Sequence, residues 1–304
     1  MFGRQADSPP ASGGGGGVIA FPPFDSLEAA WLGVLEAAEA TRDGRLLHAV
    51  LSITDPATPV PEVVAANDAL LLPRGDHTVD SVANTVFPAN LYAPPQLDYL
   101  PDLQPAEIQL LDAAADDLYS SYRDMLPELC GFDGNERGTY FGRLVSWPGK
   151  TSDGYNQLKR RVRQLRSHRD RGHSAANAAD FALEGVAEIE SATIEAVGLQ
   201  MYKSDDERQM AFPCLVHIDL SVVSNRLNLM AVYRHWHLVH KAYGNLVGLT
   251  RLLYFLSQQT GYEPGELMIH ATVANAEVGT FSHTVLKKLI AQVQTQLKND
   301  QEVI

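Results

Sequence analysis

A cysteine, an arginine and an asparagine follow one another at spacings that suit chemistry on a nucleotide. Cys214 stands in the stretch Phe-Pro-Cys-Leu at the head of two segments of alternating apolar residues, Arg234 comes 20 residues later, and Asn245 comes 11 residues beyond that. A thiolate is a nucleophile, a guanidinium is a forked, permanent anchor for phosphate, and an amide can both donate and accept at a base edge. Together they form a candidate set for holding a nucleotide and attacking its ring.

Each of these three residues also has an ordinary structural interpretation. A free cysteine is often a small buried hydrophobe, and a nucleophilic one needs a cation nearby, which Arg234 would supply if the chain folds back. Arginine often serves in a structural salt bridge, and an asparagine after a glycine is a good helix N-cap. As a base reader, Asn245 would suit uracil better than cytosine, because it can donate to O4 and accept from N3–H.

Histidines gather around the arginine. His235, His237 and His240 form the pattern H-x-H-x-x-H, and His217 and His270 lie on neighbouring predicted strands. His235 and His237 would point to one side of a strand, but the spacing is no established zinc signature, so no metal is predicted. Two uses are favoured over a metal site: substrate binding or proton transfer near neutral pH, for which His235 and His237 are the candidates, and a structural or interface role.

A basic cluster stands out in an otherwise acidic chain. Its members lie within thirteen residues: Lys159, Arg160, Arg161, Arg163, Arg166, Arg169 and Arg171. Leu158, Val162 and Leu165 recur at helical spacing, so the basic side chains occupy the exposed side of an amphipathic helix. The cluster is either a solvated helix face or a local phosphate site.

The pattern of apolar residues predicts an α+β chain. Helices are expected at 25–41, 105–125, 155–167, 244–260 and 282–298. Strands are expected at 47–53, 139–145, 186–200, 214–223, 227–234 and 266–274, with mixed structure at 62–72 and a small-residue segment at 174–180. Ser224 and Asn225 mark a hairpin turn between the two strands that follow Cys214.

Composition limits the class of protein. The chain has 304 residues, of which 45% are hydrophobic, and only two are cysteines, so we expect a cytoplasmic protein without a disulfide framework. We expect no secretory signal, because the first residues lack an apolar stretch, and no membrane span, because no apolar run is long enough. The net charge of −13 argues against nucleic-acid binding. Residues 1–17, with five consecutive glycines, are expected to be a disordered tail before a single domain over 18–304.

The order of several motifs resembles the catalytic core of thymidylate synthases. The matching segments are Tyr140–Arg143, Trp147–Pro148, Asn156–Leu158, Pro213–Cys214, Tyr233–Arg234, Gly244–Asn245 and Gly261–Leu267. In that family the run is a proline-cysteine pair, a two-strand hairpin, an arginine, an asparagine opening a helix, and a proline-glycine-acid turn. The resemblance covers residues 138 to 275.

This resemblance implies a fold and a chemistry. The fold is a thymidylate-synthase-like mixed sheet with flanking helices and a long buried helix, and one sheet face forms a homodimer. Cys214 adds to C6 of a pyrimidine nucleotide, Arg234 binds its phosphate and Asn245 reads its base. Arg169 and Arg171 reach the partner's phosphate across the dimer, Trp147 and Asn275 line the substrate site, and methylenetetrahydrofolate is the implied carbon donor.

The departures from the family pattern bear on the substrate. Leu215 replaces the histidine after the cysteine, His235 replaces a serine and His237 replaces an aspartate. Asn275 and Glu277 stand where the family has the histidine and tyrosine that bind the deoxyribose 3′-hydroxyl. No segment matches the family's general-base glutamate or its folate-closing C-terminal tail. We therefore expect methyl or hydroxymethyl transfer to a nucleotide other than dUMP, with two alternatives: a catalytically degenerate nucleotide sensor or scaffold, and a metal-dependent enzyme built on the histidines.

Overall fold

The computed structural model describes residues 17–97, 103–132, 135–136, 138–172, 176–177, 199–201 and 213–302. Its centre is a mixed sheet in the order β1-β2-β8-β6-β5-β3, with β4 beside β5 and β7 beside β8. The strands are β1 (Ile19–Ala20), β2 (Arg45–Ile53), β3 (Ala176–Asn177), β4 (Leu199–Gln200), β5 (Leu215–Val223), β6 (Arg226–Tyr233), β7 (Trp236–His237) and β8 (Glu263–Asn275). The predicted tail lies almost wholly outside the described residues.

Strand direction changes across the sheet. β8 runs antiparallel to β2 and parallel to β6, and β6 runs antiparallel to β5. Ser224 and Asn225 have φ values of 51° and 65°, the positive pair that a tight hairpin turn requires. The hairpin turn is therefore confirmed, and it returns the end of β6 to the start of β5.

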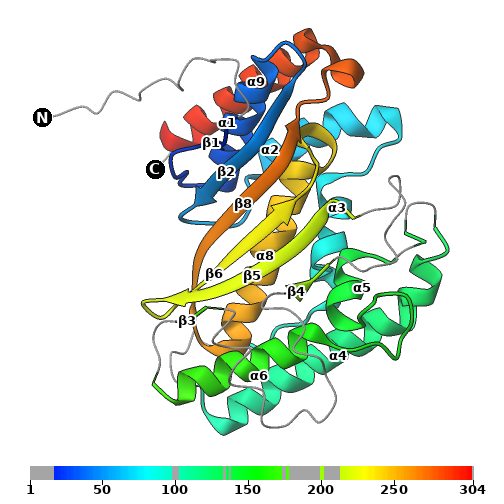
Figure 1. Ribbon diagram of the computed structural model, residues 1–304, viewed down its shortest axis with the longest axis vertical. Helices are drawn as coiled ribbons and strands as arrows, with labels where there is room; N and C mark the ends of the chain where they lie inside the picture. Colours follow the sequence, from blue (N-terminus) through cyan, green and yellow to red (C-terminus); the bar gives the residue numbers. More distant parts are fainter. Residues whose placement is uncertain are drawn as a thin grey trace, which may run out of the picture.

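Helices pack behind the sheet, as Figure 1 shows for α1, α8 and α9. The helices are α1 (Leu27–Glu39), α2 (Pro61–Leu71), α3 (Val79–Val86), α4 (Pro105–Leu129), α5 (Tyr140–Val145), α6 (Gln157–Asp170), α8 (Tyr243–Thr260) and α9 (Val278–Glu302). Short helical turns cover Leu72–Arg74 and Ala89–Leu91, and a π-helical turn covers Leu238–Ala242. An α+β arrangement with a mixed open sheet and flanking helices is therefore confirmed.

Helix α8 is the buried centre of the helical layer. It is enclosed on nearly every side, since all of its residues except Arg251, Tyr254 and Gln258 are buried. It continues directly from the π-helical turn and ends at Gly261, whose φ of 73° suits a helix C-terminus. Trp31 of α1 fixes its start: the indole N–H donates to the Leu238 carbonyl at 2.7 Å, and the ring stacks on Tyr243.

Two predicted segments were wrong. The expected strand at 139–145 is helix α5, because the Thr139 hydroxyl accepts the Gly142 N–H at 3.0 Å and caps the helix. Phe141 and Leu144, three residues apart, are then both buried. The mixed structure at 62–72 is mainly helix α2, which begins at Pro61, a favoured first position. Most of 174–180 and of the strand expected at 186–200 lies outside the described residues.

Two glycines let α8 approach α3 closely. A Cβ at Gly248 would lie 2.6 Å from the Ala83 carbonyl oxygen and 2.8 Å from Val86 Cβ, and Gly244 is similarly crowded against Val82. The contact keeps the first turns of α8, including Asn245, in place.

We expect Gly248→Ala to lower the free energy of unfolding by about 1–3 kcal/mol, because overpacking against backbone outweighs alanine's better helix propensity. Urea unfolding measures this. Gly279→Ala is the matched control, since nothing lies within 4 Å of its added Cβ, and it should be neutral or slightly stabilising. A Gly248→Ala protein as stable as the wild type would show that the helices separate without cost.

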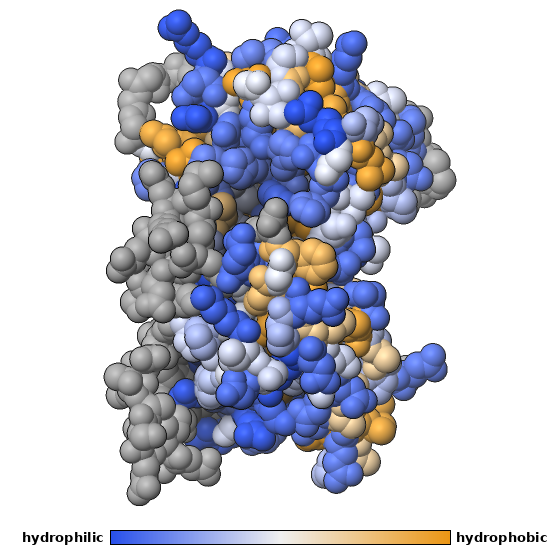
Figure 2. All heavy atoms as spheres, turned by 90° about the vertical axis from the view of Figure 1, so that its right-hand side faces the viewer, coloured by the Kyte–Doolittle hydropathy of each residue, from blue (hydrophilic) through white to orange (hydrophobic). Residues whose placement is uncertain are grey.

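The other face of the sheet is more open. Along β5, Ile218, Leu220 and Val222 are buried, whereas His217 and Asp219 between them are only half-buried. Leu47 on β2 and Met268 on β8 are 50% and 38% exposed. A different side of the molecule, seen in Figure 2, is mostly hydrophilic with separate apolar patches.

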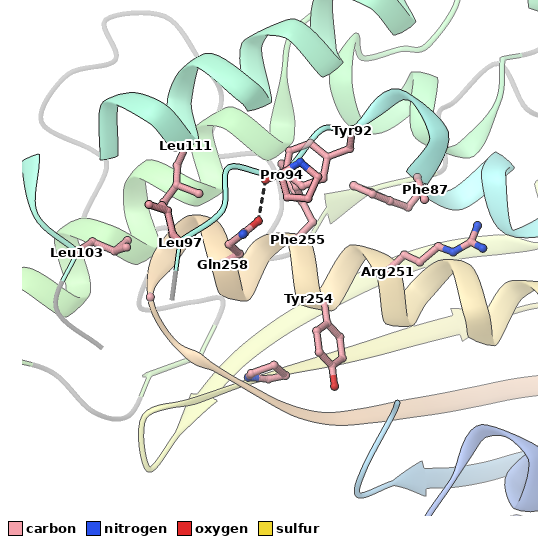
Figure 3. Close-up of a pocket in the computed structure, with 13 residues that line it drawn as sticks. Phe87, Tyr92, Pro94, Leu97, Leu103, Leu111, Arg251, Tyr254, Phe255 and Gln258 are labelled. Atoms are coloured by element: carbon pink, nitrogen blue, oxygen red, sulfur yellow. Dashed lines mark hydrogen bonds between the residues drawn. The ribbon is translucent and has the colours of Figure 1, made fainter. Parts of the chain in front are cut away.

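A hollow of about 430 Å³ lies beside the middle and the C-terminal half of α8 (Figure 3). Its wall is largely aromatic and aliphatic, with Phe87, Tyr92 and Phe255 among its members, and Tyr92 donates its hydroxyl to Gln258 at 2.8 Å. None of the residues predicted to act on a nucleotide lines it.

Candidate functional site

Cys214 lies where three elements meet at one end of the sheet. The Arg234 N–H at the end of β6 donates to the Cys214 carbonyl at 2.9 Å. The Tyr140 hydroxyl, at the start of α5, accepts the Leu215 N–H at 3.3 Å. The Arg234 side chain also turns toward this strand, because its Nε donates to the Pro213 carbonyl at 3.2 Å. The structure therefore brings the predicted nucleophile and the predicted anion anchor together.

The surroundings of the Cys214 thiol shift its pKa in opposite directions. Burial raises the pKa of Cys214 above its ordinary value of 9.0, whereas the positive charges of Arg234 and Lys241 lower it, and burial prevails. Burial also raises the pKa of the neighbouring Tyr140 hydroxyl to about 12. In this state the thiol is protonated at neutral pH, and the two cations supply the means to stabilise its thiolate.

Removing Lys241 should make the thiolate harder to form. We expect Lys241→Ala to raise the pKa of Cys214 further, because one of the two opposing positive charges is lost. The pH dependence of alkylation by iodoacetamide, measured in a Cys130→Ser background, reports that pKa. Lys287→Ala, on α9, is the control and should leave the alkylation profile unchanged. An unchanged profile in Lys241→Ala would contradict the account.

Asn245 presents an amide that the protein itself does not use. It lies in the first turn of α8, one turn after Lys241, and is only 4% exposed. Its side-chain amide makes no hydrogen bond within the described part of the chain. It is not the helix N-cap, because α8 continues from the π-helical turn without a side-chain cap. Its amide atoms are not among the fully enclosed polar atoms, so they are accessible to water or to a ligand that offers both a donor and an acceptor.

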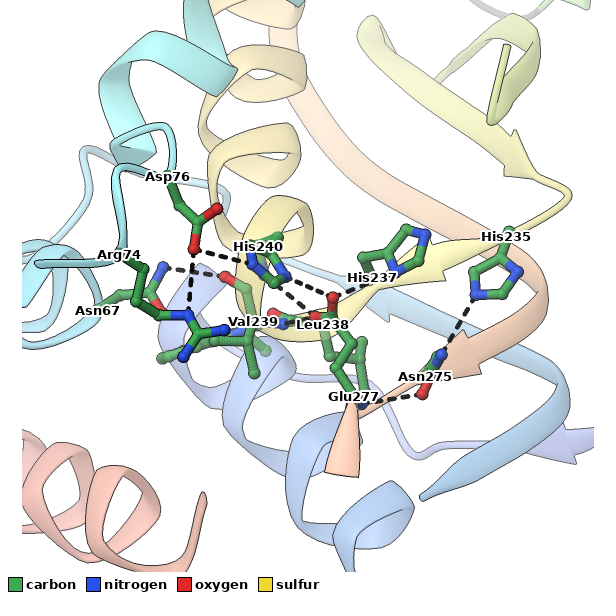
Figure 4. A network of polar contacts seen from close by, with 11 residues as sticks. Asn67, Arg74, Asp76, His235, His237, Leu238, Val239, His240, Asn275 and Glu277 are labelled. Carbon is green, nitrogen blue, oxygen red and sulfur yellow. Dashed lines mark hydrogen bonds and ion pairs between the residues drawn. The ribbon is translucent and has the colours of Figure 1, made fainter. Parts of the chain in front are cut away.

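A second group of polar residues centres on Glu277, at the start of α9 (Figure 4). One carboxylate oxygen accepts the Val239 and His240 N–H groups at 2.9 and 3.1 Å, and the other contacts Nδ1 of His240 at 2.5 Å and Nδ1 of His237 at 3.2 Å. Burial alone would raise the pKa of Glu277, but the hydrogen bonds from His237 and His240 outweigh it and hold its pKa below 4.5. Glu277 therefore anchors the π-helical turn as a carboxylate.

The histidines fall into two kinds. His240 also places Nε2 3.1 Å from Asp76, so both of its ring nitrogens face carboxylates. His235 and His237 stack with ring centres 4.4 Å apart, on the same side as expected. Burial and the positive charges around it lower the pKa of His235.

The side chain of Asn275 contacts members of this polar group. Its amide nitrogen lies 3.4 Å from His235 Nε2, and its oxygen accepts the Glu277 N–H at 2.8 Å. The predicted substrate contact at Asn275 is thus engaged in positioning His235 and Glu277.

Arg169 and Arg171 lie at the opposite end of α8. Arg169 donates to the Thr260 carbonyl at 3.3 Å, and Arg171 contacts Ser167 one turn earlier on α6. Thr260 and Asn245 are separated by fifteen residues of α8, or about 22 Å along its axis. Within one chain these arginines are therefore remote from Cys214.

Trp147 follows α5 and pairs with Tyr155 through backbone hydrogen bonds of 2.8 and 3.0 Å. It is half-buried and lies one short helix away from Tyr140. Among the described residues it has no hydrogen bond to Cys214, Arg234 or Asn245.

Some residues of the site carried little signal in the sequence. Lys241 and Asp76 stand in no motif, and only the fold brings them beside Cys214 and His240. Glu277 had a signal, because it occupies a position where the resembling family binds the sugar. Its φ of 60° is unusual for a residue other than glycine.

No three histidine, cysteine, aspartate or glutamate side chains in the described parts of the chain are arranged to hold a metal ion. Over the same residues, no helix is both long enough and apolar enough to cross a membrane. No known protein-family model matches the chain, and no curated protein matches it by sequence.

Proposed function

We propose that this protein is a thymidylate-synthase-like transferase, which adds a methyl or hydroxymethyl group to C5 of a pyrimidine nucleotide. Cys214 adds to C6, Arg234 binds the phosphate and Asn245 reads the base. The observation that carries the proposal is the unpartnered, nearly buried amide of Asn245, one helical turn from a lysine whose charge acts on the thiol. A ligand with both donor and acceptor atoms on a flat edge would satisfy that amide.

The chemistry follows from the thiol and its cations. Addition of the Cys214 thiolate to C6 makes C5 an enolate-like carbon nucleophile, which attacks an electrophilic one-carbon donor. Methylenetetrahydrofolate is the donor that the family resemblance suggests. Arg234 and Lys241 supply positive charge beside an anionic substrate, and phosphate binding between them would add negative charge to the site.

The substrate is proposed to differ from dUMP. Asn275 and Glu277, at the positions of the family's sugar-binding residues, direct their polar groups to His235, His237 and His240. The sugar is therefore recognised by other groups, and a ribonucleotide or another decorated nucleotide is the favoured class.

A homodimer through the open face of the sheet is part of the proposal. The exposed Leu47, Val223 and Met268 on that face favour a protein partner over water. A second copy would also offer its Arg169 and Arg171, which lie far from Cys214 in their own chain. Analytical ultracentrifugation should find a dimer for the wild type and a shift toward monomer for Met268→Asp. A wild-type monomer at micromolar concentration would contradict this part.

A second candidate function is a nucleotide-binding sensor or scaffold without carbon transfer. The raised pKa of Cys214 favours it, because a protonated thiol is a poor nucleophile. The phosphate anchor and base reader would serve such a protein equally well.

Calorimetric titration with UMP, dUMP, CMP and dCMP tests the proposal, with and without methylenetetrahydrofolate. We expect saturable binding of one uracil nucleotide, weakened about 10- to 100-fold in Asn245→Ala by loss of the base contact. Binding that tolerates Asn245→Ala, or no binding of any of the four nucleotides, would contradict it.

A further inference from the structure

His237 differs from its neighbours in having one ring nitrogen fixed and the other available. Its Nδ1 lies 3.2 Å from Glu277, whose side chain is only 7% exposed, whereas the His237 side chain is 40% exposed. A carboxylate that accepts from Nδ1–H fixes the tautomer and leaves Nε2 as the basic nitrogen. In Figure 4 the His237 ring lies between Glu277 and His235.

The other two histidines of the cluster are less suited to accept a proton. His240 faces Glu277 with Nδ1 and Asp76 with Nε2, so both nitrogens are engaged. His235 Nε2 lies 3.4 Å from the Asn275 amide, and its ring is stacked against His237. Of the three, His237 alone combines an oriented ring, a buried carboxylate behind it and an accessible nitrogen.

We propose that His237 is the general base of the Cys214 site and that Glu277 is its positioning residue. This inference rests on the proposed transferase function and assigns the group that the sequence did not supply, since no general-base glutamate was found. Glu277 is already ionised and held by two backbone N–H groups, so it is fixed in place to stabilise an imidazolium.

The step is removal of the C5 proton, which leads to release of the nucleotide from Cys214. After C5 has formed its bond to the one-carbon unit, it still carries its hydrogen. His237 Nε2 takes that hydrogen as a proton, and the C–H electron pair forms a double bond from C5 to the methylene carbon as the C–N bond to tetrahydrofolate breaks. A hydride from the tetrahydrofolate, which becomes dihydrofolate, then adds to this methylene to give methyl, or water adds to give hydroxymethyl. The electron pair of the exocyclic double bond moves to form the C5–C6 double bond, and the bond between Cys214 Sγ and C6 breaks with its electron pair returning to sulfur as thiolate.

Both signs of charge surround His237. The groups that face it or its immediate partners are Glu277, Asp76, His235, His240, Lys241, Arg234 and Arg45. Glu277 makes the direct contact. The cations lie farther away.

His237→Gln tests the assignment, because glutamine keeps polar atoms there but cannot accept the proton. We expect turnover to fall about 10²- to 10⁴-fold and the loss of rate in mildly acidic solution, which a histidine base causes, to disappear. Intact-mass analysis should find the variant trapped as a Cys214 adduct that carries the one-carbon unit. Unchanged turnover and pH profile, or a variant that releases product without accumulating adduct, would overturn the proposal.

His283→Gln is the matched control. His283 Nδ1 contacts the buried Glu39 at 2.7 Å, the same kind of pair, but it joins α9 to α1 away from Cys214. Its pH profile should equal that of the wild type. If His283→Gln also abolished the loss of rate in mildly acidic solution, the proposal would be overturned. That loss would then arise from any histidine–carboxylate pair and not from a base at Cys214.

A measurement on the unaltered protein guards against misfolding of the variant. Nitrogen-15 NMR should find His237 as the Nδ1–H tautomer at neutral pH, and an Nε2–H tautomer would overturn the assignment. The proposed function fails separately, since a wild type that forms no nucleotide adduct refutes the transferase whatever the tautomer.

Discussion

Replacing Cys214 by serine should abolish carbon transfer while leaving the nucleotide bound. A serine hydroxyl is far less acidic than a thiol and has no base within the described contacts of residue 214, so addition to C6 stops. We expect turnover to fall by at least about 10³-fold, since loss of a covalent nucleophile costs this much or more in other enzymes. Isotope transfer from labelled methylenetetrahydrofolate to the nucleotide measures it.

Cys130→Ser is the control for that experiment. Cys130 is the other free thiol, half-buried at the end of α4 with its Sγ near the Gly149 carbonyl. Its replacement should leave transfer within a few-fold of the wild type. Full transfer by Cys214→Ser, or equal losses in both variants, would remove Cys214 from the chemistry and leave the sensor as the better account.

Replacing Glu277 by alanine should produce the largest loss of stability. Its carboxylate is 7% exposed and accepts from two backbone N–H groups and two imidazoles. Removing it leaves the Val239 and His240 N–H groups without their acceptor and both imidazoles without their carboxylate, which we expect to cost about 3–5 kcal/mol in the free energy of unfolding. Urea unfolding near neutral pH measures this. A loss below about 1 kcal/mol would mean that water replaces the carboxylate.

The stability loss in Glu277→Ala should also depend on pH. The pKa of Glu277 in the folded protein lies below its ordinary value of 4.5, so the folded state favours the carboxylate. Its stabilising effect is therefore complete above pH 4.5 and is lost as the pH falls through the folded-state pKa. The stability difference between wild type and Glu277→Ala should shrink on acidification below that value. A difference that grows there would mean that folding raises the pKa of Glu277 instead of lowering it.

Local patterns were enough to predict much of the sheet and helix layout. Alternating apolar residues and the Ser224–Asn225 turn predict the β5–β6 hairpin, and the strongly apolar segment 244–260 predicts helix α8. Segment 139–145 was misjudged because a six-residue helix gives too few turns for periodicity to appear, and its Thr139 cap was the only local signal.

The sequence could predict only those contacts of the site that follow from a local turn of the chain. A hairpin brings its two ends together, so Cys214 and Arg234 had to meet. Asp76 and His240 are 164 residues apart, and no short-range pattern predicts such a contact. Glu277 and His237 likewise meet only because β7 pairs with β8 and delivers both to one end of the sheet. The general base that we propose, His237, was therefore accessible only through the three-dimensional arrangement.

Intact-mass spectrometry after incubation with each pyrimidine nucleotide and methylenetetrahydrofolate tests the central claim most directly. The account predicts a mass increase of one nucleotide, or of one nucleotide with its carbon donor, in the wild type and in Cys130→Ser but not in Cys214→Ser. Peptide mapping should place it on Cys214. Tight nucleotide binding without an adduct in any of the three proteins, under conditions of full occupancy, would contradict the account.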